Sequence, residues 1–159
     1  SERSRGLGDV YKRQSMYRVD GPLTQRSLGE TEFVRAQAAI SASGDFGAAR
    51  ACDVMFGNVD LTLGSAVEPI LEQHIEASGG RFRGVRISSG WHSHEGIHNV
   101  GDRESLLLEA SVNEAVNIVH RMNLSLDVWL YHTQLEEVAQ LADNHPDLTI
   151  VLNLSLIHI

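Results

Sequence analysis

The amino-acid sequence predicts an α/β fold in which about four parallel strands alternate with helices. Short apolar runs of strand length alternate with longer stretches whose apolar residues recur at helical spacing. Nearly all the turns between these segments are only a few residues long. Units that alternate strand and helix pair their strands in parallel through right-handed crossovers. Four such units form either a small open sheet or half of a barrel.

The first helix and the first strand follow a segment rich in turn-forming residues. Residues 15–29 are predicted to be a loop because they contain Asp-Gly-Pro and further Ser and Gly residues. A helix is expected over 30–43, and Gly44 ends it. The apolar run over 51–61 is too short for a typical helix and is predicted to be a buried strand.

The second helix and strand carry clearer signals. Ser65 followed by Glu68 matches a capping box, which predicts that a helix begins there and continues to Gly79. Residues 82–88 are predicted to form the next strand. Its alternation places two sets of side chains on opposite faces of the sheet, namely Arg83, Val85 and Ile87 on one face and Gly84, Arg86 and Ser88 on the other.

The C-terminal half repeats the alternation twice. A long loop is expected over 89–102, followed by a helix over 103–122 and a strand over 124–131. A helix over 134–143 and a strand over 148–153 complete the series. In the strand over 124–131 the alternation sets Asp127, Trp129 and Tyr131 opposite Leu126, Val128 and Leu130.

Composition excludes several classes of function. The net charge of −8 and the pI of about 5.4 argue against a nucleic-acid partner, which would need Lys and Arg to neutralise phosphates. The chain has no apolar run of about eighteen residues, so no membrane-spanning segment is expected. Cys52 is the only cysteine, which excludes an internal disulfide and is typical of a cytoplasmic protein. Phosphate-binding and Gly-x-Ser-x-Gly motifs are also absent from the sequence.

The two ends of the sequence differ in character from the middle. The chain does not begin with Met, and both ends resemble translated adapter sequence. We therefore expect residues 1–14 to be an artefactual or disordered leader and residues 154–159 to be an artefactual tail.

Polar residues gather where the predicted strands end, which is where βα units carry their functional groups. Arg86 lies near the end of strand 82–88. Its guanidinium could hold a carboxylate or a polarised carbonyl, or it could form a structural ion pair with an acidic neighbour. Tyr131, His132 and Gln134 stand where a strand passes into a helix and are candidate pocket residues.

The loop over 89–102 holds Trp91 and three histidines. His92, His94 and His98 could bind a metal, with Glu95 in the fourth place, but a solvated loop rich in histidine is the favoured interpretation. Trp91 is a candidate substrate-binding residue.

Three further polar residues have two interpretations each. Asp127 could act as a base or satisfy polar groups inside a barrel. His74 stands at core spacing in its helix and is expected to be structural. His145 lies near a helix end, where the helix dipole favours a cation.

Residues 15–153 resemble amidohydrolase-related proteins of the group that includes fuconolactonase and pyrone-dicarboxylate lactonase. The matching stretches follow one another along the chain. They include Met16-Tyr-Arg-Val-Asp-Gly-Pro22, Gly29-Glu-Thr-Glu-Phe-Val34, Asp60-Leu-Thr-Leu-Gly64, Arg81-Phe-Arg-Gly-Val-Arg86, Leu124-Ser-Leu-Asp-Val-Trp-Leu-Tyr-His-x-Gln-Leu135 and Ile150-Val-Leu-Asn153. The resemblance implies a partial (β/α)8 TIM barrel.

The resemblance also implies a chemistry for the intact enzyme. Such enzymes hydrolyse a lactone or a similar acyl bond of a small molecule with the help of a divalent metal, usually zinc or manganese. By this resemblance, the strands that supply most ligands are expected to lie outside the sequence, and Leu154 stands at the expected position of a ligand histidine. The chain is therefore expected to be an inactive internal fragment that binds no metal itself. Arg86, Trp91, Tyr131 and His132 correspond to the substrate side.

Two other functions remain open at this point. The first is a self-contained, non-catalytic α/β module that binds a ligand through its histidine loop. The second is a decarboxylase or hydratase on the same barrel. The intact enzyme could also be a homo-oligomer.

Overall fold

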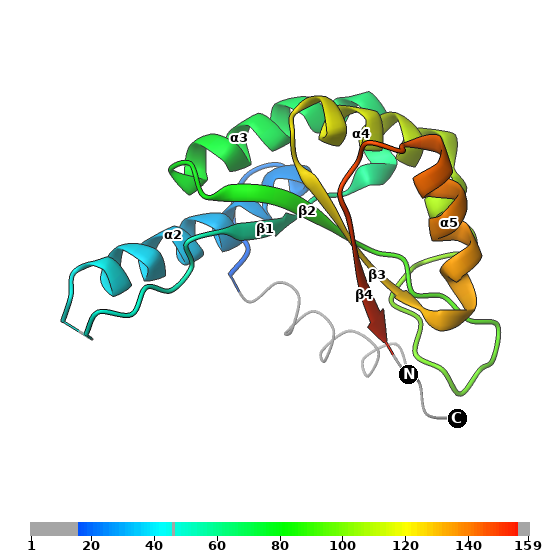
Figure 1. The fold of residues 1–159 in the computed structure, drawn as a ribbon, viewed down its shortest axis with the longest axis horizontal. Helices are drawn as coiled ribbons and strands as arrows, with labels where there is room; N and C mark the ends of the chain where they lie inside the picture. Colours follow the sequence, from blue (N-terminus) through cyan, green and yellow to red (C-terminus); the bar gives the residue numbers. More distant parts are fainter. Residues whose placement is uncertain (1–15, 46, 156–159) are drawn as a thin grey trace.

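In the computed structural model, which describes residues 16–45 and 47–155, four parallel strands form one sheet (Figure 1). The strands lie in chain order β1-β2-β3-β4. They are β1 (Met55–Asn58), β2 (Phe82–Ser88), β3 (Ser125–Tyr131) and β4 (Ile150–Ser155). The α-helices are α2 (Leu28–Ala42), α3 (Glu68–Ser78), α4 (Ala110–Arg121) and α5 (Leu135–Asn144), and short 3-10 helices lie at 23–25, 61–67, 106–108 and 132–134. The predicted α/β class is confirmed.

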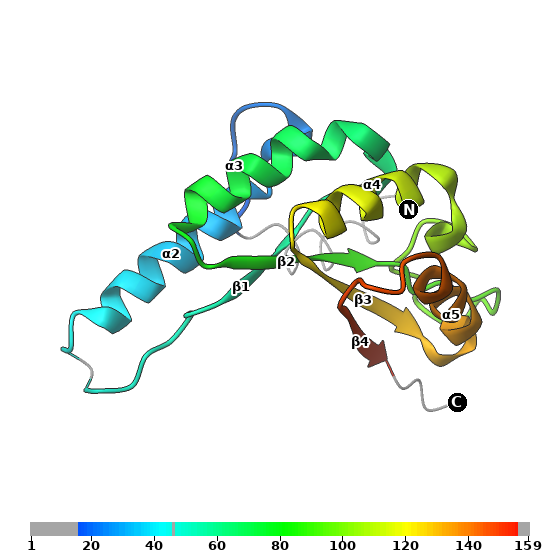
Figure 2. The same cartoon turned by 45° about the horizontal axis from the view of Figure 1, so that its top comes forward.

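The strand order decides between an open two-sided sheet and part of a barrel. Each strand pairs in parallel with the next one along the chain, so every crossover has the same sense and returns the helices to one face. Figures 1 and 2 show α3, α4 and α5 arching over that face of a twisted sheet, while the other face carries no helix from the part of the chain that is described. This arrangement is a partial TIM barrel, with its helices outside.

The hydrophobic core lies between the sheet and the helices. Leu126, Val128 and Leu130 of β3 are completely buried there, and α4 packs over them through Val112 and Val116. Burial of one such side chain contributes about 1.5–3 kcal/mol relative to exposure. The residues of β4 that pair with Val128 and Leu130 are less buried than those of β3. At this edge of the sheet, Leu152 is 49% exposed and Leu154 is 40% exposed. Stability therefore resides in β2, β3 and the helices above them.

Left-handed backbone explains why two predicted elements are shorter than expected. The strand predicted over 51–61 is reduced to Met55–Asn58, because Cys52 adopts a φ of 59° that is incompatible with extended structure. The helix predicted from 103 begins only at Ala110, because Ser105 has a φ of 56° and separates the chain before it from the helix.

The predicted capping box is wrong. Ser65 lies inside the 3-10 helix over 61–67, and α3 begins at Glu68 without a side-chain cap. Asp60 is the actual cap of this region, since its carboxylate accepts a hydrogen bond from the Thr62 amide at 3.0 Å. Gly64, with a φ of 58°, interrupts the 3-10 helix over 61–67.

The predicted terminal segments are only partly covered by the structure. β4 continues to Ser155, so the first two residues of the expected tail belong to a strand. Residues 1–14 and 156–159 lie outside the described residues. None of the helices within the described ranges has the length and apolar character needed to cross a membrane.

Candidate functional site

The open face of the sheet is lined by an inner row of side chains fixed by strand register. Arg86 pairs with Asn58 of β1 and with Asp127 of β3, and Ser88 pairs with Trp129. Residues that pair across parallel strands point to the same face. The inner row as a whole is Phe56, Asn58, Gly84, Arg86, Ser88, Asp127, Trp129, Tyr131, Val151 and Asn153.

A cavity of about 720 Å³, here called the arginine cavity, opens over this row. Arg86 and Tyr131 both line it, as expected for side chains at the same rim of a parallel sheet. Other lining residues are Glu30, Phe56, Gly57, Asn58, Ser88, His98, Val100 and Trp129. Gly90 allows the loop over 89–102 to pass close to Trp129 of β3, because a Cβ at Gly90 would lie 2.4 Å from the Trp129 ring.

Arg86 forms an ion pair with Asp127 that leaves part of both side chains unused. Its Nε and Nη2 donate to the single oxygen Oδ2 at 3.0 and 2.5 Å. The Arg86 side chain remains 44% exposed, whereas that of Asp127 is only 8% exposed. The other carboxylate oxygen, Oδ1, is buried without a hydrogen-bond partner. Asp127 therefore orients a guanidinium whose Nη1 makes no hydrogen bond within the described part of the chain.

Tyr131 connects the end of β3 to the loop over 89–102, here called the histidine loop. Its hydroxyl donates a hydrogen bond to the backbone carbonyl of His98. Its ring meets that of Trp129 edge to face, with centroids 5.4 Å apart. Tyr131 is buried, so it forms the wall of the cavity at the loop.

Gln134 holds the start of the histidine loop through two hydrogen bonds to its backbone. Its Oε1 accepts a hydrogen bond from the Trp91 amide at 2.9 Å, and its Nε2 donates to the Ser89 carbonyl at 3.0 Å. The side chain is buried and bridges loop and helix. Trp91 is half-buried and His132 is exposed at the start of the 3-10 helix over 132–134, and neither lines the arginine cavity.

The histidine loop forms local turns rather than a metal centre. His92 Nδ1 accepts from the His94 amide and His94 Nδ1 accepts from the Gly96 amide, both at 3.0 Å. Within residues 16–45 and 47–155, no group of three or more His, Cys, Asp or Glu side chains is arranged to hold a metal ion. Leu154 pairs with Leu130 in the outer row, so the expected ligand position faces away from the cavity. The described residues alone therefore do not supply a set of metal ligands.

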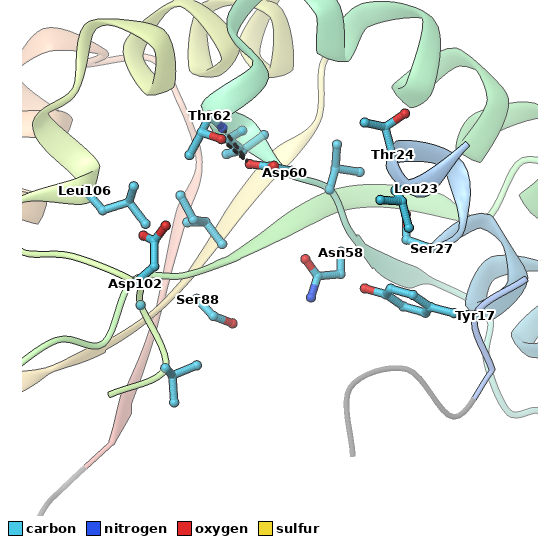
Figure 3. A pocket seen from close by; sticks show the side chains of 15 residues that line it. Tyr17, Leu23, Thr24, Ser27, Asn58, Asp60, Thr62, Ser88, Asp102 and Leu106 are labelled. Carbon is cyan, nitrogen blue, oxygen red and sulfur yellow. Dashed lines mark hydrogen bonds between the residues drawn. The ribbon is translucent and has the colours of Figure 1, made fainter. Parts of the chain in front are cut away.

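A second cavity of about 370 Å³, here called the polar pocket, lies at the C-terminal ends of β1 and β2 (Figure 3). Asn58, Asp60, Ser88 and Asp102 line it together with residues before α2. Figure 3 shows Asp102 and Tyr17 on opposite sides of the pocket, with Ser88 and Asn58 between them. The sequence interpretation missed Asn58, Asp60 and Asp102. The signal was available, because Asn58 and Asp60 end a predicted strand and Asp102 ends the long loop.

His74 is buried and structural, as expected. Its Nδ1 lies 2.7 Å from the Thr31 hydroxyl and its Nε2 lies 3.2 Å from the Ser27 hydroxyl. Its ring stacks on Phe82 at 5.2 Å. Burial lowers the pKa of His74 from 6.5 to about 4, so the imidazole is neutral at physiological pH. Burial also lowers the pKa of His145, which opposes the charged form that the helix dipole favours.

Comparisons with known proteins agree with this architecture. An uncharacterized protein of Sinorhizobium fredii, y4mH, is 30% identical to the chain over 87 residues, which are 55% of the chain and 28% of that protein. No solved structure shows a significant match. The family model described as Amidohydrolase matches residues 28–153, which is well over half of the chain. The chain therefore belongs to the amidohydrolase family.

Proposed function

We propose that the chain supplies the substrate-binding rim of a metal-dependent hydrolase that opens a lactone, or a similar cyclic ester or amide, of a small carboxylated or sugar-derived compound. The observation that carries the proposal is Arg86, whose partly exposed guanidinium lines the arginine cavity. In this proposal the zinc or manganese ion belongs to the complete enzyme and is held by residues other than those described. The role of this chain is then to hold the substrate.

Arg86 keeps a hydrogen-bond donor for a ligand, although Asp127 balances its charge. Oδ2 of Asp127 accepts hydrogen bonds from Nε and Nη2 of the guanidinium, which leaves Nη1 able to donate to a ligand. A carboxylate or a polarised carbonyl accepts such a charge-assisted hydrogen bond well. Asp127 restricts the rotation of the Arg86 guanidinium, so little side-chain entropy is lost when a ligand binds.

The sequence-predicted residues fall into two groups in this proposal. Arg86 and Tyr131 line the arginine cavity and contact the substrate. Trp91, His132 and Gln134 lie outside the cavity lining, and Gln134 acts by holding the loop in place. Trp91 would contact the substrate only if the loop packed against it, and His132 has no contact role in this proposal.

Carboxylate binding by the 159-residue chain tests the role of Arg86 directly. Hexanoate, titrated into isotope-labelled protein and followed by NMR, is expected to bind weakly with shifts at Arg86, Trp129 and Tyr131. Arg86→Gln should raise the Kd by about tenfold or more, since a hydrogen bond between charged groups is worth about 1.5–3 kcal/mol.

Arg83→Gln is the matched control for this experiment. Arg83 lies on the same strand, but its guanidinium bonds to the backbone carbonyls of Gly80 and Phe82 and does not line the arginine cavity. Equal loss of binding in both variants, or no loss in Arg86→Gln, contradicts the proposal. In the complete enzyme, decarboxylation without lactone opening would exclude the proposed reaction class.

A further inference from the structure

The two outermost strands of the sheet, β1 and β4, each leave one edge free. Among the described residues, β1 pairs only with β2 and β4 pairs only with β3. Proteins commonly protect a free edge with a charged side chain or a proline, and neither strand contains one. The backbone of both edges is therefore able to pair with a further strand.

Large apolar side chains gather beside these two edges. Of the twelve large hydrophobic side chains that are exposed in the described part of the chain, eight lie there and are 40–58% exposed. At about 200 Å² for a fully exposed side chain of this size, they present roughly 700 Å² per chain, close to the ~800 Å² that each partner contributes to a stable interface. These eight are Phe33 and Ile40 of α2, Val54 and Phe56 at β1, Leu135 of α5, and Val151, Leu152 and Leu154 of β4.

The surface at the β1 edge is formed with α2. Figures 1 and 2 show α2 beside β1, and α2 also packs against α3. A cavity of about 220 Å³, here called the edge groove, lies between α2 and β1 and is lined mainly by apolar side chains, including Phe33, Met55 and Phe56. Ile40 lies seven residues after Phe33 and therefore on the same face of the helix. This edge offers an apolar groove and a stripe of large side chains.

The surface at the β4 edge complements the first. Leu152 and Leu154 pair with Val128 and Leu130, which are fully buried, but are themselves about half exposed because less of the helical layer covers them. On α5, Glu137 faces the 3-10 helix over 106–108. The opposite side of α5 carries Leu135, Ala139 and Ala142, all exposed. Small alanines leave room for a neighbouring helix with large contact residues.

We infer that two copies of this chain close into one eight-stranded barrel, in which β4 of each copy pairs in parallel with β1 of the other. Leu152 and Leu154 of one copy enter the edge groove of its partner, and the exposed stripe of α2 packs on the alanines of α5. Four strands in each copy and a twofold axis supply the eight strands of a closed βα barrel. The arginine cavity, which ends at β1, then gains β4 of the partner subunit as a further lining strand. This inference does not depend on the ligand of Arg86.

Sedimentation velocity over a dilution series of the 159-residue chain tests the association. We expect a species of twice 17.5 kDa that dissociates on dilution. Phe33→Lys and Leu152→Lys should each raise the dissociation constant at least about tenfold, because an ammonium group loses its hydration when it is buried against apolar surface. Lys lowers the net charge of −8, so added repulsion between copies cannot explain the loss.

Leu108→Lys is the matched control. Leu108 is an exposed leucine of the 3-10 helix over 106–108, which packs against α4 and α5 and lies away from both edges. This variant should associate as the unsubstituted chain does. Circular dichroism establishes that each variant is folded, and the two edge substitutions guard against failure of one.

Mixing the two edge variants tests the pairing of β4 with β1. One copy of Phe33→Lys and one of Leu152→Lys share one unsubstituted interface, so their mixture should associate more tightly than either variant alone. Phe33→Lys that dimerises as well as the unsubstituted chain would show that two β4 edges pair with each other, which overturns the inference. A monomer at every concentration, or species that grow beyond the dimer, would overturn it as well.

Discussion

The two faces of the sheet are made by alternate residues of the same strands, yet they serve different purposes. On the outer face of β3, Leu126, Val128 and Leu130 are fully buried beneath helices. On the inner face of the same strand, Asp127 and Tyr131 make hydrogen bonds to Arg86 and to the histidine loop. A shift of one residue in register would exchange the two sets.

This difference separates the residues that determine stability from those that are available for ligand binding. The outer face is held by close apolar packing, which is sensitive to volume and indifferent to charge. The inner face is held by a few polar contacts around cavities, and the buried Oδ1 of Asp127 has no hydrogen-bond partner among the described residues. Substitutions on the outer face should therefore act on unfolding, and those on the inner face on binding.

The largest expected effect comes from removing volume on the outer face. Leu126→Ala should lower the free energy of unfolding by about 3 kcal/mol, because a large buried side chain is lost and its site collapses only partly. Urea denaturation followed by circular dichroism measures this loss. Ser88→Ala, on the inner face of the neighbouring strand, should change stability by less than about 0.5 kcal/mol. Similar losses in the two variants would remove the distinction between the faces.

A smaller effect is expected from His74, which is buried in the outer layer. The folded-state pKa of His74 is about 4, below the ordinary value of 6.5, so the unfolded chain binds a proton that the folded chain does not. Stability is complete above pH 6.5 and falls as the pH drops toward 4. Between pH 7 and pH 5 the loss should be roughly 2 kcal/mol.

NMR titration of the His74 ring and urea denaturation at both pH values test this prediction. His74→Gln should lose much of the pH dependence, whereas His92→Gln, in the histidine loop, should retain it. A His74 signal that titrates near pH 6.5 in the folded protein would show that the outer layer admits a charge.

The smallest effect on stability should come from Gln134, which follows β3 and holds the histidine loop. Gln134→Ala removes the hydrogen bonds to the Trp91 amide and the Ser89 carbonyl, and should cost about 1.5 kcal/mol. Amide hydrogen exchange should accelerate at Trp91 and little at Val128 in the core. Gln140→Ala, at an exposed position of α5, is the control. Unchanged exchange at Trp91 would mean that the loop is held by other contacts.

Much of this fold follows from local patterns. Period-two alternation identified both faces of β2 and β3, and helical spacing located α3 and α5 to within a few residues. Two of the errors, the starts of β1 and α4, occurred beyond single residues in a left-handed conformation. Cys52 and Ser105 carry no local signal for positive φ, so the shortened β1 and the late start of α4 could not be predicted.

By itself the sequence determined which residues share a face and which strand ends carry polar groups, because side-chain alternation is a local property of the backbone. The tertiary structure alone decided which of these groups meet. Arg86 and Asp127 are 41 residues apart in the chain, and Tyr131 and His98 are 33 apart. Their contacts depend on the register between strands and on the path of the loop. Asn58, Ser88 and Asp102 come together in one pocket for the same reason.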